Sequence, residues 1–229
     1  VPAELRKQIK RLAWIPVPEM AAFQSSLEGK ALYLPQEEPF GTHEALTMAA
    51  VRDGTETRPY QVGAYRFMPS CGLYFLAACA EEKQGELLER LVRALGTGGI
   101  GGKVSAGYGT FAVDDVILLN EPFDAQTDWL YTALTMQNPK HYLLLTTSLP
   151  TDGELEDVLD GAYYQLARRG GYVQSNTFSS TPQRKRTQYF LAAGAMLART
   201  FAGTLYNVAD AGAHPVYRYA KPMMLGVSF

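Results

Sequence analysis

The chain has 229 residues, of which 47% are hydrophobic and 19% are charged. This composition supplies enough apolar material for a packed core and excludes a disordered tail or a fibrous repeat. With 21 basic and 23 acidic residues the formal net charge is −2, which by itself argues against a nucleic-acid-binding protein. No apolar run approaches the ~20 residues needed to cross a bilayer, so we expect no membrane partner.

The first half of the sequence predicts one helix flanked by strands. Residues 84–95 carry leucine and valine at helical spacing, which is typical of an amphipathic helix. Strand-like runs precede it at 60–68 and 73–79 and follow it at 110–119. A loop at 96–109 joins the helix to the last strand and holds seven of the chain's 21 glycines.

The second half predicts a further set of strands around one helix. Residues 141–149 are β-like, and residues 155–166 space their apolar side chains as a helix that Gly170 and Gly171 end. The remaining strands are expected at 172–178, 187–193, 204–208 and 216–227, the last of them bent at Pro222.

The order of these elements predicts the fold class. It runs β-β-α-β and then β-α-β-β, which is a ferredoxin-like (RRM-like) fold written twice, with the opening strand and helix of the first copy absent. We therefore predict an α+β protein with tandem ferredoxin-like domains at residues 1–122 and 123–229. The best candidate for the linker is Asp124–Asp128.

Cysteine and histidine give little sign of a metal or redox site. If 72–79 is a strand, Cys71 and Cys79 lie more than ~20 Å apart, too far for a disulfide, so we expect two buried thiols in a reducing, cytoplasmic compartment. The three histidines are scattered, and no cluster has zinc spacing. We expect no metal and no cofactor.

The charges are distributed unevenly along the chain. Residues 1–160 carry 13 basic and 22 acidic residues, a net of −9, whereas residues 161–229 carry eight basic and one acidic, a net of +7. Cations interleaved with tyrosine and phenylalanine are typical of a surface that neutralises phosphates and stacks bases. The alternative is that the cations are scattered over several faces and the aromatics form core. The candidates for RNA contact are Arg168, Arg169, Arg184, Lys185 and Arg186.

The glycine-rich loop does not fit the common nucleotide-binding loops. Gly96, Gly98 and Gly101 match G-x-G-x-x-G, but that motif needs a strand before it and a helix after it, and here the order is reversed. The sequence also does not match the phosphate-binding loop of NTPases, because Thr97 replaces its first glycine and Val104 its serine or threonine. A glycine backbone can still approach another chain closely, so RNA contact is the hypothesis that we favour over a flexible connection.

The loop sequence from Gly98 to Phe111 resembles the glycine-rich loop of the RAMP superfamily of CRISPR proteins. Five further segments, at residues 12–16, 51–54, 72–75, 168–173 and 214–219, are similar to the family of the fourth subunit of the type III-A (Csm) interference complex. They occur in the same order and span nearly the whole chain.

The resemblance implies a non-catalytic subunit that grips the repeat-derived 5′ handle of CRISPR RNA. Its implied partners are that crRNA, the large polymerase-nuclease subunit and the backbone subunit. Arg52 and Arg58 fall where related subunits extend a β-hairpin thumb. In the loop, the residues implied to contact RNA are Gly98, Gly99, Gly101, Gly102, Lys103, Ser105, Gly107 and Tyr108.

Two other functions stay open at this point. A metal-independent endoribonuclease that matures CRISPR RNA would need a histidine general base, for which His43 and His214 are the candidates. A structural scaffold would instead use its basic face to meet an acidic protein. We expect the chain not to be an enzyme, because neither histidine has an evident partner in the sequence.

Overall fold

The computed structural model of the chain describes residues 7–8, 12, 14–27, 33–34, 39–52, 56–121, 123–175 and 177–228. The chain divides into two compact units, one of residues 36–118 and one that joins residues 1–35 to residues 119–229. The division into domains at 122 and 123 stays a prediction. Within the described residues, no helix combines the length and apolar character that crossing a bilayer requires.

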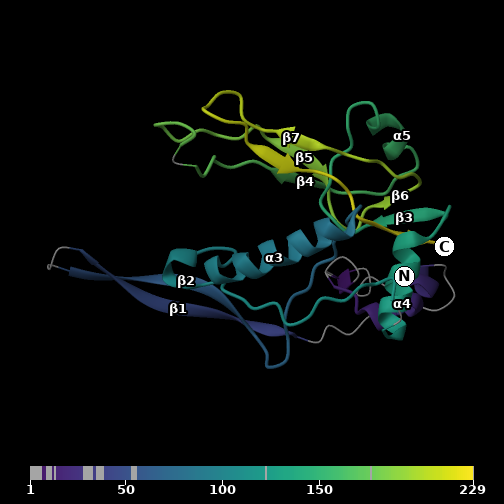
Figure 1. Cartoon of the computed structure of the whole chain (residues 1–229), viewed down its shortest axis with the longest axis horizontal. Coiled ribbons are helices and arrows are strands. Elements are labelled where there is room, and N and C mark those ends of the chain that lie inside the picture. Colours follow the sequence, from purple (N-terminus) through teal and green to yellow (C-terminus); the bar gives the residue numbers. More distant parts are fainter. Residues whose placement is uncertain are drawn as a thin grey trace. The chain divides into compact units, whose positions relative to one another are not determined.

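The unit of residues 36–118 is built on one long antiparallel hairpin (Figure 1). Its strands are β1 (Gly41–Arg52) and β2 (Glu56–Phe67), followed by α3 (Glu82–Gly98) and the short 3-10 helix η2 (Val104–Ala106). The register runs from Gly41 opposite Phe67 to Arg52 opposite Glu56. The hairpin confirms the strand predicted at 60–68. It also contains Arg52 and Arg58, where the family resemblance implies a β-hairpin, although the range of its first strand was not predicted.

The helix predicted at 84–95 is confirmed as α3, one turn longer at its C-terminal end. The Gln84 side chain accepts a hydrogen bond from the Ala80 amide near the start of the helix. Gly99 ends it at a φ of +82°, and the Gly99 amide donates to the Leu95 carbonyl. A glycine suits this position because a positive φ is strained for other residues.

The strands predicted at 73–79 and 110–119 are wrong. Both segments contain no strand and leave large apolar side chains exposed, among them Tyr74 at 76% and Leu118 at 59%. A strand forms only where a neighbour pairs with its backbone, and no ladder within the described residues joins either segment. Cys71 and Cys79 are both exposed, so the expectation of buried thiols is also wrong.

The other unit is an assembly of short strands with helices at its edge. Its main sheet has three antiparallel strands in the order β6-β3-β9, and two further pairs are β4-β5 and β7-β8. The mixture of helices and antiparallel sheets confirms an α+β protein, while the tandem ferredoxin-like arrangement stays a prediction. The elements are η1 (Val17–Glu19), α2 (Met20–Leu27), α4 (Ala125–Thr135), β3 (His141–Leu144), α5 (Leu155–Leu159), β4 (Leu166–Arg169), β5 (Gln188–Leu191), β6 (Met196–Leu197), β7 (Leu205–Asn207), β8 (Tyr217–Tyr219) and β9 (Met224–Val227).

The segment predicted as a linker begins a helix instead. The Asp124 carboxylate accepts hydrogen bonds from the amides of Gln126 and Thr127 and caps α4. These bonds satisfy two of the amides that the first turn of a helix leaves without partners, and the bond from the Thr127 amide above all lowers the pKa of Asp124. Leu130 is buried, so the helix packs within the unit.

The remaining predictions for this unit are correct in part. Strands are confirmed within 141–149, 187–193 and 204–208, and the strand predicted at 216–227 is interrupted around Pro222 to give β8 and β9. The helix predicted at 155–166 is shorter, because Tyr163 pairs its backbone with Met196 instead. The strand predicted at 172–178 is also wrong, apart from an isolated bridge between Tyr172 and Arg184.

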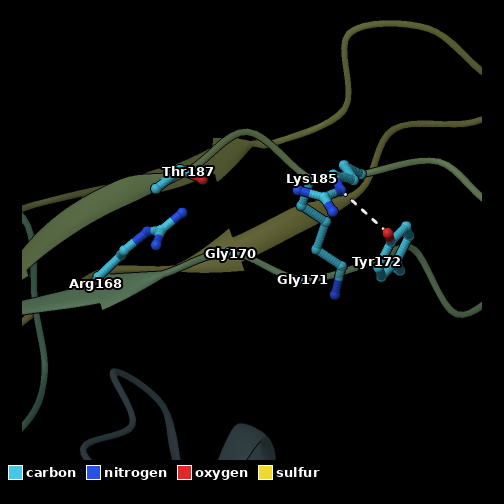
Figure 2. Close-up of a pocket in the computed structure, with 7 residues that line it drawn as sticks. Arg168, Gly170, Gly171, Tyr172, Lys185 and Thr187 are labelled. Carbon is cyan, nitrogen blue, oxygen red and sulfur yellow. Dashed lines mark hydrogen bonds between the residues drawn. The ribbon is translucent and has the colours of Figure 1, made fainter.

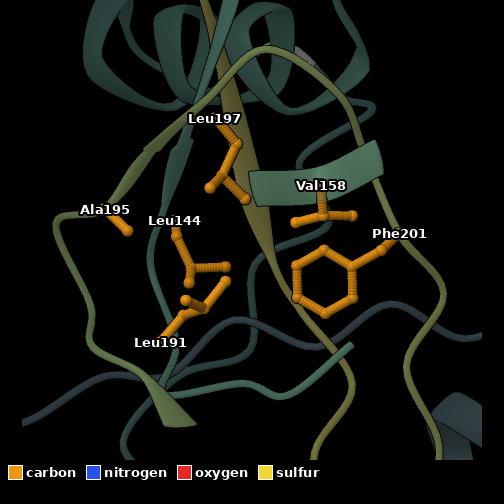
Figure 3. Close-up of a cluster of buried hydrophobic side chains, with 6 residues drawn as sticks. All are labelled: Leu144, Val158, Leu191, Ala195, Leu197 and Phe201. Carbon is orange, nitrogen blue, oxygen red and sulfur yellow. The ribbon is translucent and has the colours of Figure 1, made fainter. Parts of the chain in front are cut away.

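The core of this unit is a cluster of buried apolar side chains (Figure 3). Leu144 from β3 and Leu197 from β6 are fully buried, and Leu191 at the end of β5 packs with them. Val158 and Phe201 complete one side of the cluster. The cluster therefore ties the β4-β5 hairpin to the main sheet through Leu191.

Glu154, just before α5, holds two loops together through its carboxylate. One oxygen accepts from the Thr151 amide at 2.8 Å and the Thr151 hydroxyl at 2.7 Å, and the other accepts from the Ala202 amide at 2.7 Å. These bonds favour the charged form, so the Thr151 amide above all lowers the pKa of Glu154.

We expect Glu154→Gln to lower the free energy of unfolding by about 1 kcal/mol at pH 7, since hydrogen bonds to a partly exposed charged group are worth about this much. The pKa of Glu154 is lower in the folded state than in the unfolded state, where it is ~4.3. The carboxylate therefore stabilises the fold at pH values above ~4.3, and this contribution is lost as pH falls through the folded pKa. Urea unfolding should therefore show a difference at pH 7 that disappears toward pH 3. A difference that stays constant across this range would contradict the assignment.

Candidate nucleic-acid interface

The glycine-rich loop of residues 98–109 folds back on itself between α3 and residue 111. The Ile100 amide donates to the Gly109 carbonyl at 2.9 Å, and the Phe111 amide donates to the Gly96 carbonyl at 3.0 Å. Positive φ angles occur at Gly99, Gly101, Lys103, Gly107 and Gly109. The backbone path therefore favours glycine at 99, 101, 107 and 109.

Lys103, in the middle of the loop, contacts the hairpin. Its backbone is left-handed at φ +60°, and its Nζ lies 5.0 Å from the centroid of the Tyr60 ring on β2. This is a cation–π distance, which fixes the direction of the ammonium group. Within the described residues Lys103 has no acidic partner, while Ser105 lies in η2 and Tyr108 is half-buried.

The two arginines predicted on the hairpin lie near its tip. Arg58 is exposed on β2, opposite Ala50. Arg52 ends β1, and its side chain lies outside the described part of the structure. A role for either in RNA contact stays a prediction.

A cluster that we call the basic pocket lies at the end of the β4-β5 hairpin (Figure 2). The cavity is about 380 Å³ in volume. Arg184 donates from Nε to the Tyr172 hydroxyl at 3.1 Å, and its guanidinium carbon lies 5.2 Å from the centroid of the Tyr172 ring. The lining residues are Arg168, Gly170, Gly171, Tyr172, Arg184, Lys185 and Thr187.

The local backbone positions these side chains. Gly171 turns the chain after β4 at φ +106°, and the Lys185 amide donates to the Gly171 carbonyl at 2.9 Å. Arg218 of β8 donates to the carbonyls of Arg169 at 3.1 Å and Gly170 at 3.4 Å. Burial and the nearby Arg169 lower the pKa of Arg218. Arg218 therefore supports the turn from within the unit.

The predicted cations separate into two groups in the structure. Arg168, Arg184 and Lys185 line the basic pocket, where no ion pair with a described acidic residue neutralises them. Arg186 instead pairs with Asp210 at 3.1 Å, and Arg169 reaches the Thr147 hydroxyl at 3.4 Å. Neither Arg169 nor Arg186 lines the pocket.

Three residues of the pocket were not predicted. Gly170, Gly171 and Thr187 were absent from the predicted contacts, whereas Tyr172 is one of the aromatic residues that lie among the cations of residues 161–229. The isolated bridge from Tyr172 to Arg184 brings together residues twelve positions apart. The pair Gly170-Gly171 followed by an aromatic was a usable signal for a turn that presents a ring.

The two candidate histidines lie in different surroundings. Both ring nitrogens of His214 have hydrogen-bond partners, the Ser175 hydroxyl at 2.9 Å from Nε2 and the Pro215 carbonyl at 2.9 Å from Nδ1. His43 is exposed on β1 and packs its ring against Tyr65. Among the residues described, no group of three or more His, Cys, Asp or Glu side chains could hold a metal ion.

Comparison with known proteins identifies the family. Residues 137–227 match the family model described as the CRISPR Csm4 C-terminal domain. The chain is 35% identical over 223 residues to the CRISPR protein Csm4 of Mycobacterium tuberculosis, an alignment that covers 97% of this chain and 69% of that protein. The chain belongs to the Csm4 family. Csm4 of Streptococcus thermophilus is 32% identical over 165 residues, or 72% of this chain and 50% of that protein.

A solved structure supports the same fold. The match is to a chain of the crystal structure of the Csm3-Csm4 subcomplex of the type III-A CRISPR-Cas interference complex, with a TM-score of 0.50 and 17% identity. It covers 92% of this chain and 60% of that chain. The present chain therefore spans less than two thirds of the length of that neighbour. The resemblance to the CRISPR type III-A family is confirmed.

Proposed function

We propose that this Csm4-family chain is a non-catalytic RNA-binding subunit of a type III-A CRISPR complex that anchors the 5′ handle of crRNA. The observation that carries the proposal is the convergence of Arg168, Arg184 and Lys185 on one pocket without a neutralising carboxylate. Such a site attracts a polyanion, because unpaired cations gain most from phosphate oxygens.

The glycine-rich loop supplies the second element of the proposal. Its backbone is exposed over most of its length, and Lys103 offers a cation whose direction is fixed by Tyr60. We propose that the loop contacts the RNA backbone, where such contacts fix register without reading sequence.

The proposed protein partners follow from the family. We propose that the chain joins the backbone subunit to the large polymerase-nuclease subunit in the cytoplasm, and that residues 1–122 and 123–229 form two ferredoxin-like domains. The neighbour of known structure is found in a Csm3-Csm4 subcomplex, which supports the first contact. The large apolar side chains exposed at 73–75 and 116–118 are a suitable surface for such a neighbour.

Binding of handle RNA tests the proposal. The double variant Lys103→Ala/Arg168→Ala should bind the repeat-derived 5′ handle at least tenfold more weakly than the wild type, and the slope of log affinity against log salt should fall by about two. Fluorescence anisotropy at several salt concentrations measures both quantities. Arg199→Ala is the matched control, because Arg199 is paired with Asp157 at 2.9 Å and with Asp160 at 3.8 Å.

Three outcomes would argue against the proposal. Unchanged affinity and unchanged complex assembly in the double variant would refute it. Cleavage of a repeat RNA without metal, lost in His43→Ala, would favour the endoribonuclease instead. A salt slope near zero for the wild type would favour a scaffold that meets an acidic protein.

A further inference from the structure

We propose that the basic pocket holds a single nucleotide extruded from the bound RNA strand. Its base would stack on the Tyr172–Arg184 pair, and its phosphate would lie toward Arg168 at the opposite end of the pocket. This inference rests on the proposed function for its ligand, RNA, and adds how the pocket recognises it.

The size of the pocket suits one nucleotide. Its volume of about 380 Å³ lies at the lower end of the roughly 300–1,000 Å³ that small-ligand sites occupy. A base paired within a duplex could not enter, because its edges and faces are already covered, so the ligand is single-stranded.

The charges of the pocket select a phosphate. Three cations line it, and the described residues place no carboxylate among the lining side chains. Figure 2 shows Arg168 of β4 and Thr187, the residue before β5, at one end of the pocket, with Lys185 and Tyr172 at the other. A phosphate can accept several charge-assisted hydrogen bonds at once, and guanidinium and ammonium groups donate such bonds.

The aromatic end of the pocket selects a planar ring. Tyr172 is 48% exposed although Arg184 lies over its ring, so part of the pair remains accessible. The hydrogen bond from Arg184 Nε to the Tyr172 hydroxyl holds the two groups together. Unpaired bases stack on aromatic rings and on arginine planes. An acidic peptide would satisfy the cations but would leave this surface unused.

Backbone hydrogen bonds make the pocket preorganised for a ligand. Gly170 and Gly171 add no side chain to the wall of the pocket, so a ligand can approach the main chain closely. The bonds from Lys185 to Gly171 and from Arg218 to Gly170 fix this wall. A nucleotide would therefore enter a site that needs little ordering, which favours affinity.

An abasic scan of the RNA tests the inference. Handle RNAs that each lack one base are titrated against wild type and Tyr172→Ala by fluorescence anisotropy. With the wild type, one position should lose about tenfold in affinity when its base is removed, which is typical of one stacked base. With Tyr172→Ala the intact RNA should lose a similar factor, and removal of that same base should cost nothing further.

Two variants serve as controls. Tyr172→Phe keeps the ring and should retain the response to that base, and Tyr163→Ala removes a tyrosine that is 77% exposed outside the pocket and should behave as wild type. A flat abasic profile with tight wild-type binding would overturn the nucleotide pocket and leave the proposed function intact. Polyglutamate binding as tight as RNA, and weakened equally by Tyr172→Ala, would also overturn it. Failure of the wild type to bind intact handle RNA would contradict the proposed function itself.

Discussion

Gly109→Ala is expected to open the glycine-rich loop and to lower the free energy of unfolding by about 3 kcal/mol. The backbone of Gly109 has a φ of +74°, and a Cβ built there would lie 1.8 Å from the Ile100 carbonyl oxygen. Positive φ costs an alanine roughly 1–3 kcal/mol, and relief of the clash would break the hydrogen bond from Ile100 to Gly109, worth about 1 kcal/mol more.

Substitutions at two other glycines of the same loop distinguish the strain of a positive φ from the clash with the Ile100 carbonyl. Gly101 has a φ of +91° but open space around its Cβ position, so Gly101→Ala should show the conformational strain alone. Gly98 has neither a positive φ nor a close neighbour, so Gly98→Ala should be close to neutral. Urea unfolding gives the energies, and hydrogen exchange at the Ile100 amide should speed up in Gly109→Ala only. Equal effects of all three substitutions would contradict the loop geometry.

Gly109→Ala is also expected to change the affinity for RNA. When the loop opens, Lys103 should leave the Tyr60 ring, and we expect handle RNA to bind about tenfold more weakly than to wild type. Gly98→Ala should bind RNA normally. Full affinity in Gly109→Ala, together with lost protection at Ile100, would remove the loop from the proposed interface.

Leu144→Ala is expected to lower the free energy of unfolding by about 2–5 kcal/mol, the range for truncating a buried leucine. Leu144 has no exposed surface and packs in the cluster with Leu191 and Leu197. Truncation removes the transfer energy of its methyl groups and leaves a cavity in a core that also anchors β5.

Leu205→Ala is the matched control, because Leu205 on β7 is 50% exposed and should change stability by less than about 1 kcal/mol. Thermal and urea unfolding measure both variants. Because Leu191 links this core to the basic pocket, Leu144→Ala should also weaken RNA binding at temperatures near its lowered midpoint. Equal small effects of the two variants would show that the cluster is not the core.

The fold was predictable where the signal is local. The spacing of Leu87, Leu88, Leu91 and Val92 identified α3, because a helix forms its hydrogen bonds within its own segment. Strands depend on partners elsewhere in the chain, and the errors lie there. Residues 73–79 and 110–119 have strand-like sequences but no strand pairing within the described residues. Tyr163 has the spacing of a helical residue, but its backbone pairs with Met196.

The candidate site was predictable by composition and only partly by residue. The net charge of +7 over residues 161–229 pointed to the part of the chain that holds the basic pocket. It did not separate the cations, because Arg186 is adjacent in sequence to Lys185 and still pairs with Asp210. Tyr172 joined the site through a turn whose geometry depends on Gly171.

The sequence by itself determined the family, the α+β class, and the change of charge from −9 before residue 161 to +7 after it. Only the tertiary structure decided which cations remain available. Arg199 is neutralised by Asp157, 42 residues away, while Arg168, Arg184 and Lys185 meet no described carboxylate. The reason is that Coulomb attraction depends on distance in space, and the fold alone sets that distance.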